Sequence, residues 1–118
     1  MRILYIEDNP NDAKLVQRYV ATTPHHLQVV PSLEEAYQSY SESPNYDLIM
    51  VDILINNKRS GYDFARNCQT QGYHGPIVAV TALTSPQDEQ ACVDAGFSAV
   101  LAKPFYITAL ADLLRQFS

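Results

Sequence analysis

The sequence predicts one α/β domain: a doubly wound, five-stranded parallel sheet with helices on both faces. Short apolar runs alternate five times with amphipathic stretches of helical periodicity, which favours strand-helix units. The apolar runs are nearly continuous, as is typical of strands buried on both faces. The chain has 118 residues, of which 47% are hydrophobic and 18% charged, enough for one core and too few for two domains of ordinary size.

The first two strand-helix units have clear boundaries. Residues 3–6 form an unbroken apolar run and predict the first strand. Asn9-Pro10 predicts a helix start, because asparagine caps helices and proline suits the first turn. Residues 27–30 predict the second strand. Ser32 and Glu35 then predict a capping box at the start of the second helix.

The third and fourth units follow the same alternation. Residues 48–51 are the most apolar run and predict the third strand. We expect a polar loop over 56–60 and a short helix after Gly61. Residues 76–81 predict the fourth strand, and Ser85-Pro86 repeats the cap-plus-proline signal of a helix start.

The last unit completes the pattern. Gly96 is placed to end the fourth helix, and residues 99–102 predict a fifth strand that ends at Lys103-Pro104. Residues 107–114 have helical spacing of apolar side chains, although Tyr106 is a poor cap. Parallel neighbours require crossover helices, and the right-handed rule distributes these helices over both faces of the sheet.

Charge and cysteine usage exclude several classes of protein. Thirteen acidic residues against eight basic ones give a net charge of −5 at pH 7, which disfavours binding of nucleic acid or an anionic membrane. No apolar run approaches the ~20 residues of a membrane-spanning helix. Cys68 and Cys92 form no disulfide framework, so we expect buried thiols and a reducing, cytoplasmic setting.

Chemically active side chains follow the predicted strands. Glu7-Asp8 follows the first strand, Asp52 the third, Thr81 ends the fourth and Lys103 follows the fifth. Doubly wound sheets bind ligands at the carboxyl ends of their strands. Three carboxylates held together repel one another, and a hard divalent cation relieves that repulsion. Magnesium suits such a site because it binds a few carboxylate oxygens and keeps waters.

With these residues in place, the chain resembles the receiver domain of two-component response regulators over essentially its whole length. The segments that carry the resemblance are ILYIEDN at 3–9, YDLIMVD at 46–52, VTA at 80–82 and AKPF at 102–105. The resemblance implies a flavodoxin-like (βα)5 fold. It also implies a single receiver domain over residues 1–118, with no output domain in the chain.

By this resemblance, Asp52 accepts a phosphoryl group from a histidine kinase or a histidine phosphotransfer protein. The implied Mg²⁺ ligands are Glu7, Asp8, Asp52 and the backbone carbonyl of Leu54. The implied contacts to phosphoryl oxygens are Thr81 and Lys103. Such a domain promotes its own aspartyl phosphorylation and dephosphorylation without being a turnover enzyme. It passes the signal to an unidentified downstream protein by protein contacts, and a homodimer is compatible with this role.

Three features depart from the family pattern or refine it. Asn56 and Gly61 stand four and nine residues after the acceptor, where the family usually has proline at four and glycine at eight. Val100 replaces the usual aromatic residue, so we expect phosphate relay or signalling through a modified surface without an aromatic switch. Leu54 and Leu83 cannot hydrogen-bond an attacking water, which predicts a long-lived phosphoryl-aspartate.

Other functions on the same fold remain as alternatives. A phosphorylation-independent pseudo-receiver would act as a docking module, but the complete acidic, hydroxyl and lysine set speaks against it. A flavin or nucleotide binder would need glycines or hydroxyls after the first strand, where this chain has Glu7-Asp8. An aspartyl phosphatase usually has a second aspartate two residues after its nucleophile, where this chain has Leu54.

Overall fold

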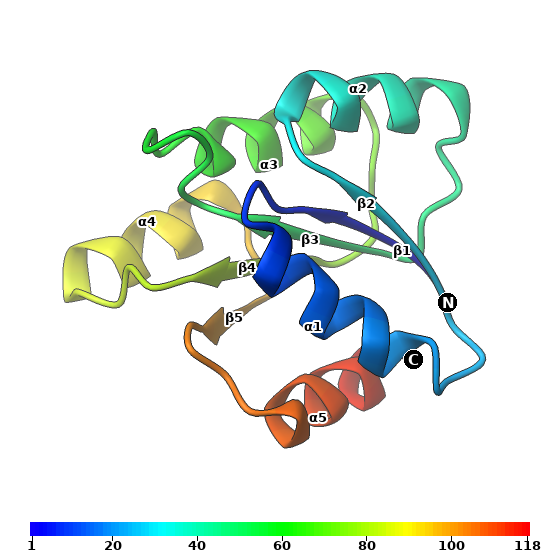
Figure 1. The fold of residues 1–118 in the computed structure, drawn as a ribbon. Coiled ribbons are helices and arrows are strands. Elements are labelled where there is room, and N and C mark those ends of the chain that lie inside the picture. Colours follow the sequence, from blue (N-terminus) through cyan, green and yellow to red (C-terminus); the bar gives the residue numbers. More distant parts are fainter.

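The five apolar runs form one parallel sheet in the order β2-β1-β3-β4-β5 (Figure 1). The computed structural model describes residues 1–118. The strands are β1 (Arg2–Ile6), β2 (His26–Val30), β3 (Leu48–Asp52), β4 (Ile77–Thr81) and β5 (Ala99–Ala102). The helices are α1 (Pro10–Val20), α2 (Leu33–Glu42), α3 (Gly61–Thr70), α4 (Pro86–Ala95) and α5 (Ile107–Phe117). The predicted α/β fold, with five strands and five helices in strict alternation, is confirmed.

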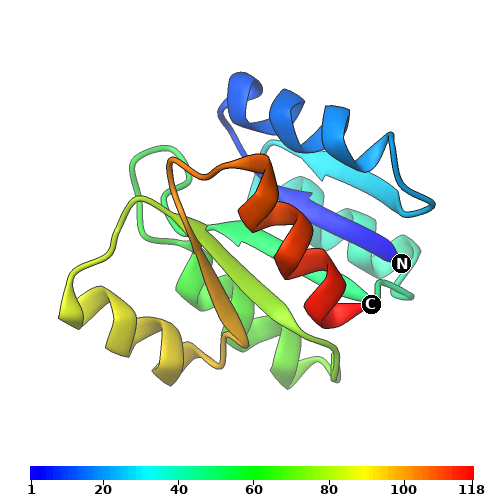
Figure 2. The ribbon, with the colours of Figure 1, turned by 90° about the horizontal axis from the view of Figure 1, so that it is seen from below.

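The helices cover both faces of the sheet. Helices α1 and α5 lie on the face seen in Figure 2, and α2, α3 and α4 cover the opposite face. On the first face Val16 and Leu110 pack against Tyr5, all fully buried; on the second Ala36 and Phe64 pack among the buried residues of β1, β3 and β4. The central strands are therefore buried on both sides, which explains their unbroken apolar sequences.

The sheet order determines where a site can form. From β1 the chain crosses to β2 in one direction, and β3 then lies on the other side of β1. Strand order thus reverses between β1 and β3, and their carboxyl ends border the crevice in which doubly wound folds bind ligands. No helix of the structure is both long and apolar enough to span a bilayer.

Local signals set most helix ends as expected. The Asn9 side chain caps α1 by accepting hydrogen bonds from the amides of Asn11 and Asp12. Ser32 accepts one from the amide of Glu35, so half of the expected capping box forms. Gly96 ends α4 with a left-handed φ of 88°, a conformation that costs glycine little.

The segment expected as a polar loop over 56–60 contains a tight hairpin turn. Ile55 and Lys58 exchange two backbone hydrogen bonds of 3.0 and 3.1 Å. Between them Asn56 and Asn57 have φ values of 53° and 61°, the left-handed pair that a type I′ turn requires. Asparagine tolerates this conformation better than other residues with a side chain, so the extra loop residue is accommodated as ordered structure.

Candidate functional site

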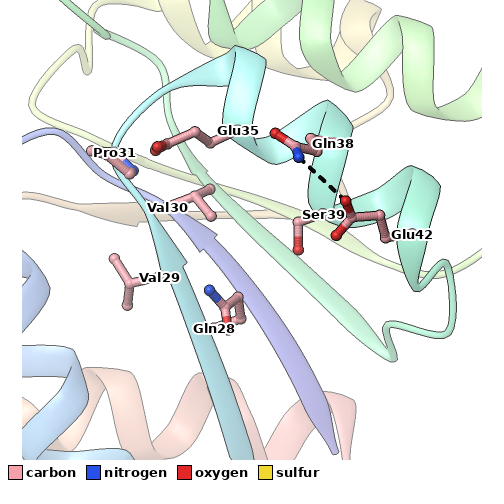
Figure 3. Close-up of a pocket in the computed structure, with 8 residues that line it drawn as sticks. All are labelled: Gln28, Val29, Val30, Pro31, Glu35, Gln38, Ser39 and Glu42. Atoms are coloured by element: carbon pink, nitrogen blue, oxygen red, sulfur yellow. Dashed lines mark hydrogen bonds between the residues drawn. The ribbon is translucent and has the colours of Figure 1, made fainter.

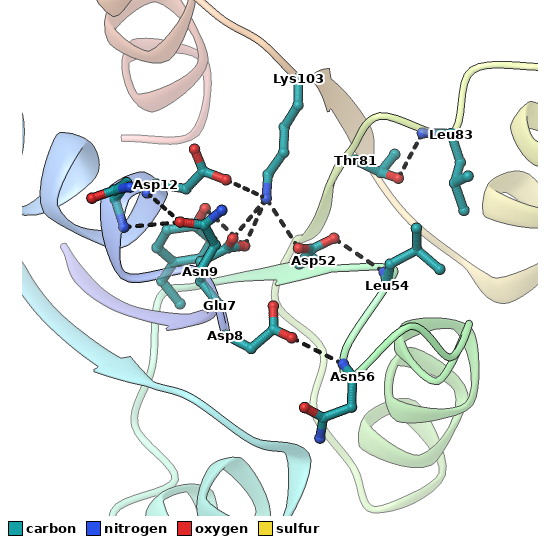
Figure 4. A network of polar contacts seen from close by, with 12 residues as sticks. Glu7, Asp8, Asn9, Asp12, Asp52, Leu54, Asn56, Thr81, Leu83 and Lys103 are labelled. Atoms are coloured by element: carbon teal, nitrogen blue, oxygen red, sulfur yellow. Dashed lines mark hydrogen bonds and ion pairs between the residues drawn. The ribbon is translucent and has the colours of Figure 1, made fainter.

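The register of the sheet brings the polar strand ends together at one edge (Figure 4). Asp52 is the last residue of β3, and Thr81 the last of β4. Just beyond β1, the Glu7 amide donates to the carbonyl of Val30, and just beyond β5 the Lys103 amide donates to that of Thr81. The parallel ladder therefore continues one residue past two of its strands and holds their first polar residues at the sheet edge.

Lys103 lies at the centre of an ionic cluster. Its Nζ atom lies 2.7 and 2.9 Å from the two carboxylate oxygens of Glu7. The same atom lies 3.0 Å from Oδ2 of Asp52 and 3.0 Å from Oδ2 of Asp12. An ammonium has three protons, so Lys103 offers one to each of the three carboxylates, with the Glu7 bond shared between two oxygens. The ammonium thereby contacts each of the three carboxylates, and its single positive charge offsets one negative charge of the cluster.

Three of the acidic side chains also form a group that could hold a cation. Glu7, Asp8 and Asp52 each offer an oxygen, and these oxygens lie within 4.8 Å of one another. Glu7 and Asp52 are buried, whereas Asp8 is exposed. Its Oδ2 accepts a 2.9 Å hydrogen bond from the amide of Asn56 in the hairpin turn. An all-carboxylate set that is open to solvent at Asp8 fits Mg²⁺, which binds a few carboxylate oxygens and keeps several waters.

Burial and charge set the protonation of the cluster. Burial raises the pKa of Glu7; Lys103 opposes this effect and Asp52 adds to it, leaving a pKa of about 8. Burial by itself lowers the pKa of Lys103, but its bonds to Glu7, Asp52 and Asp12 outweigh burial and raise that pKa. Burial and the nearby carboxylates also raise the pKa of Tyr5, whose hydroxyl donates to Oε2 of Glu7 at 3.3 Å. The cluster without a cation therefore retains a proton at Glu7 near neutral pH.

The opposite side of Asp52 has a different construction. Its Oδ1 accepts a 3.0 Å hydrogen bond from the amide of Leu54. Thr81 is 1% exposed, and its hydroxyl oxygen accepts a 2.9 Å bond from the amide of Leu83. Thr81 makes no hydrogen bond to the carboxylate of Asp52. Val100 lies within β5, and its side chain is 42% exposed. It is apolar and takes no part in this polar network.

The structure adds two groups that the sequence analysis missed. Asp12 reaches Lys103 from the first turn of α1, and the amide of Asn56 reaches Asp8 from the hairpin turn. The capping signal at Asn9-Pro10 already fixed where α1 begins and hence which residues occupy its first turn. The adjacent asparagines at 56 and 57 were a signal for a turn with two left-handed residues.

A separate groove of about 430 Å³ lies between the end of β2 and helix α2 (Figure 3). Its rim carries Glu35 and Glu42, and the amide group of Gln38 donates to Glu42 at 3.2 Å. None of the residues of the ionic cluster lines this groove.

Curated relatives are similar in sequence to nearly the whole chain. Protein RcaC of Microchaete diplosiphon is 31% identical over 120 residues, covering 98% of this chain and 18% of that protein. Response regulator RppA of Synechocystis is 30% identical over 117 residues, covering 98% of this chain and 49% of its own length. The signal transduction histidine-protein kinase BarA of Escherichia coli is 27% identical over 122 residues, covering 99% and 13%. The chain thus spans half or less of each of these relatives.

Solved structures and a family model give the same assignment. The BeF3-activated N-terminal receiver domain of Klebsiella pneumoniae RstA has a TM-score of 0.88 at 25% identity, covering 99% of this chain and 97% of that one. Vibrio cholerae chemotaxis protein CheY4 shares the fold, with a TM-score of 0.85 at 21% identity and coverage of 99% and 98%. The family model described as the response regulator receiver domain matches residues 3–115. The chain therefore belongs to the response regulator receiver domain family of two-component signal transduction.

Proposed function

We propose that Asp52 accepts a phosphoryl group from a phosphohistidine on a histidine kinase or a phosphotransfer protein, in a reaction that depends on Mg²⁺. Receiver domains are signalling modules, and relatives of this chain include both response regulators and a histidine kinase. The phosphorylated domain then passes its signal on through contacts with another protein.

One observation carries the proposal: the Asp52 carboxylate lies next to a cation and to two further carboxylates. Oδ2 of Asp52 is 3.0 Å from the ammonium of Lys103. Oxygens of Glu7, Asp8 and Asp52 lie within 4.8 Å of one another. Phosphoryl transfer requires a positioned nucleophile and positive charge around the transferred group. This arrangement provides the nucleophile and one fixed cation, the ammonium of Lys103. It also provides carboxylate ligands for a second cation, Mg²⁺.

In the proposed transfer, a carboxylate oxygen of Asp52 forms a bond to phosphorus while the P–N bond of the phosphohistidine breaks. The electron pair of that bond remains on the imidazole nitrogen of the donor. Bound Mg²⁺ supplies positive charge that offsets the charge of the phosphoryl oxygens. The ammonium of Lys103 pairs with one phosphoryl oxygen in place of Oδ2. The amide of Leu54, which donates to Oδ1, holds the carboxylate in a single orientation.

A small phosphodonor tests the proposal directly. We expect incubation with acetyl phosphate and Mg²⁺ to add the mass of one phosphoryl group, as an adduct stable in acid and labile in base. The adduct should be absent in Asp52→Asn and in the presence of a chelator. It should persist in Asp63→Asn, a matched loss of an exposed carboxylate on α3. A wild-type chain without the adduct would contradict the proposal and support a phosphorylation-independent docking module.

The lifetime of the adduct follows from the neighbours of Asp52. Leu54 and Leu83 lie two residues beyond Asp52 and Thr81, and neither side chain offers a hydrogen bond to an attacking water. We therefore expect slow loss of the phosphoryl group. Leu54→Asn should shorten the half-life severalfold, measured as decay of the adduct after removal of the donor. An unchanged half-life in this variant would contradict the stated role of Leu54.

A further inference from the structure

Asp12 is the one partner of Lys103 that lies outside the proposed metal ligands. Its Oδ2 is 3.0 Å from Nζ of Lys103, and its side chain is 37% exposed (Figure 4). The position of Asp12 depends on the start of α1. Asn9 caps the helix, its Oδ1 accepting bonds from the amides of Asn11 and Asp12 at 2.9 and 3.4 Å. The first turn of α1 is thereby anchored beside the end of β1.

The three carboxylate partners of Lys103 differ in what the proposed reaction requires of them. Glu7 and Asp52 belong to the carboxylate group that would hold the cation, and Asp52 also becomes the phosphorylated residue. Glu7 would then share its charge with the cation, and the contact of Lys103 with Oδ2 of Asp52 would be replaced by one with a phosphoryl oxygen. Asp12 belongs to neither set and keeps its carboxylate throughout. It is the only one of the three whose carboxylate neither belongs to the group that would hold the cation nor is phosphorylated, so its contact with Lys103 needs no change during the reaction.

We infer that Asp12 is a positioning residue, which holds the ammonium of Lys103 over Asp52 while the cation and the phosphoryl group engage the other carboxylates. The inference rests on the proposed function of Asp52. A free lysine side chain has a large rotamer entropy, and an anchor present before the reaction reduces the ordering needed at the moment of transfer. Asp12 acts through Lys103 and does not touch the reacting atoms.

Two simpler roles for Asp12 make different predictions. An acidic residue in the first turn of a helix stabilises the helix through its dipole, and this contribution is independent of Lys103. A nearby negative charge also attracts Mg²⁺, and this effect changes the concentration of Mg²⁺ needed for half-maximal rate. Positioning instead changes the rate at saturating Mg²⁺ and requires Lys103 to be present.

The test is the rate of phosphorylation by acetyl phosphate as a function of Mg²⁺ concentration. We expect Asp12→Asn to reduce the rate at saturating Mg²⁺ by about threefold to tenfold, a partly exposed ion pair being modest in strength. The half-saturating Mg²⁺ concentration should stay within about twofold of wild type. In a Lys103→Met background, Asp12→Asn should have almost no further effect. Asp63→Asn removes an equal charge from α3 and serves as the control.

Equal rates for wild type and Asp12→Asn at saturating Mg²⁺ would overturn the inference. So would an undiminished effect in the Lys103→Met background, which would assign Asp12 a structural role. A second readout needs no phosphorylation: the ammonium protons of Lys103, observed by NMR in the metal-free protein, should exchange faster in Asp12→Asn. If wild type takes no phosphoryl group, the proposed function fails. The exchange measurement still decides whether Asp12 anchors Lys103, and unchanged exchange would overturn that anchoring.

Discussion

The two oxygens of Asp52 face two differently built flanks. The ionic flank, at Oδ2, consists of Glu7, Asp12 and Lys103. The backbone flank, at Oδ1, consists of Leu54, Thr81 and Leu83. On the ionic flank charged side chains from three elements contact one another, with the bond from Lys103 to Glu7 joining residues 96 positions apart. On the backbone flank each hydrogen bond joins residues only two positions apart.

The two flanks therefore have different roles: the ionic flank offsets the charge of the Asp52 carboxylate, and the backbone flank orients that carboxylate. The ionic flank depends on the whole fold, because α1, β1 and β5 must all be in place for its contacts. The backbone flank depends on the local conformation just beyond β3 and β4. Changes on the ionic flank should therefore be large and dependent on pH, whereas changes on the backbone flank should be smaller and independent of pH.

The largest expected effect is that of Lys103→Met in the absence of Mg²⁺. The substitution removes the cation that contacts Asp52, which is 7% exposed, and Glu7, which is 2% exposed. Breaking a buried pair leaves an uncompensated charge, so the free energy of unfolding should fall by about 3 kcal/mol in denaturant titrations. Lys58→Met, at an exposed lysine of the hairpin, should change it little. Equal stability of the two variants would contradict the dependence of the ionic flank on Lys103.

The next effect is a pH dependence that originates at Glu7. Its pKa rises on folding from 4.5 to about 8, so the folded protein holds an extra proton between these values. The free energy of unfolding of the metal-free protein should therefore fall as pH rises through this window. The contribution approaches about 1.4 kcal/mol per pH unit at its steepest.

Unfolding curves between pH 5 and pH 8 in a chelator measure this slope. Glu7→Gln lacks the titrating carboxyl, so its slope should be shallower than that of wild type over the same window. The difference between the two curves isolates Glu7 from the histidines, which both proteins share. Parallel curves would show that Glu7 does not retain a proton in the folded state.

A smaller effect is expected on the backbone flank. Thr81→Val removes the oxygen that accepts the amide of Leu83 and leaves that amide without its partner. The cost should be about 1 kcal/mol in the free energy of unfolding, the usual value for one hydrogen bond. Its pH profile should follow that of wild type, because Thr81 makes no bond to the ionic flank. A weaker pH dependence of the free energy of unfolding in Thr81→Val would show that the two flanks are coupled, which would contradict their independence.

The smallest effect concerns the hairpin that continues from the backbone flank. Arg59 pairs with Asp88 on α4 at 3.2 Å, with side-chain exposures of 59% and 8%. Because the arginine is mostly solvated, Arg59→Gln should cost only about 0.5 kcal/mol. Arg66→Gln breaks the pair with Asp63, in which both partners are exposed, and should cost less still. A larger loss in Arg66→Gln than in Arg59→Gln would contradict this order.

Sequence reasoning predicted the fold because each element carries its own local signal. Buried parallel strands require unbroken apolar runs, and the caps at Asn9, Ser32 and Ser85 are visible in the sequence. The edge strand β2 begins at His26, one residue before its predicted start, because a strand exposed on one side tolerates a polar residue. The reciprocal hydrogen bond of the capping box, from the amide of Ser32 to the side chain of Glu35, is absent. The sequence pattern alone does not determine whether this bond forms.

The site was predictable in part, for a related reason. Strand-end residues such as Glu7 and Asp52 follow directly from strand positions, and parallel strands bring them to one edge. The role of Asp12 could not be predicted in this way, because its contact with Lys103 depends on how α1 packs against the sheet and on which side chain reaches the ammonium. The bond from Asn56 to Asp8 depends on the hairpin turn, which places a backbone amide where a side-chain pattern gives no indication.

The central claim is that Asp52, and no other carboxylate of the cluster, receives the phosphoryl group. Reductive trapping tests it most directly: borohydride reduces an acyl phosphate to an alcohol and releases phosphate. After treatment with acetyl phosphate and Mg²⁺, peptide sequencing by mass spectrometry should find homoserine at residue 52 alone. Homoserine at residue 8 or residue 12, 5-hydroxynorvaline at residue 7, or no conversion at any position would contradict the account.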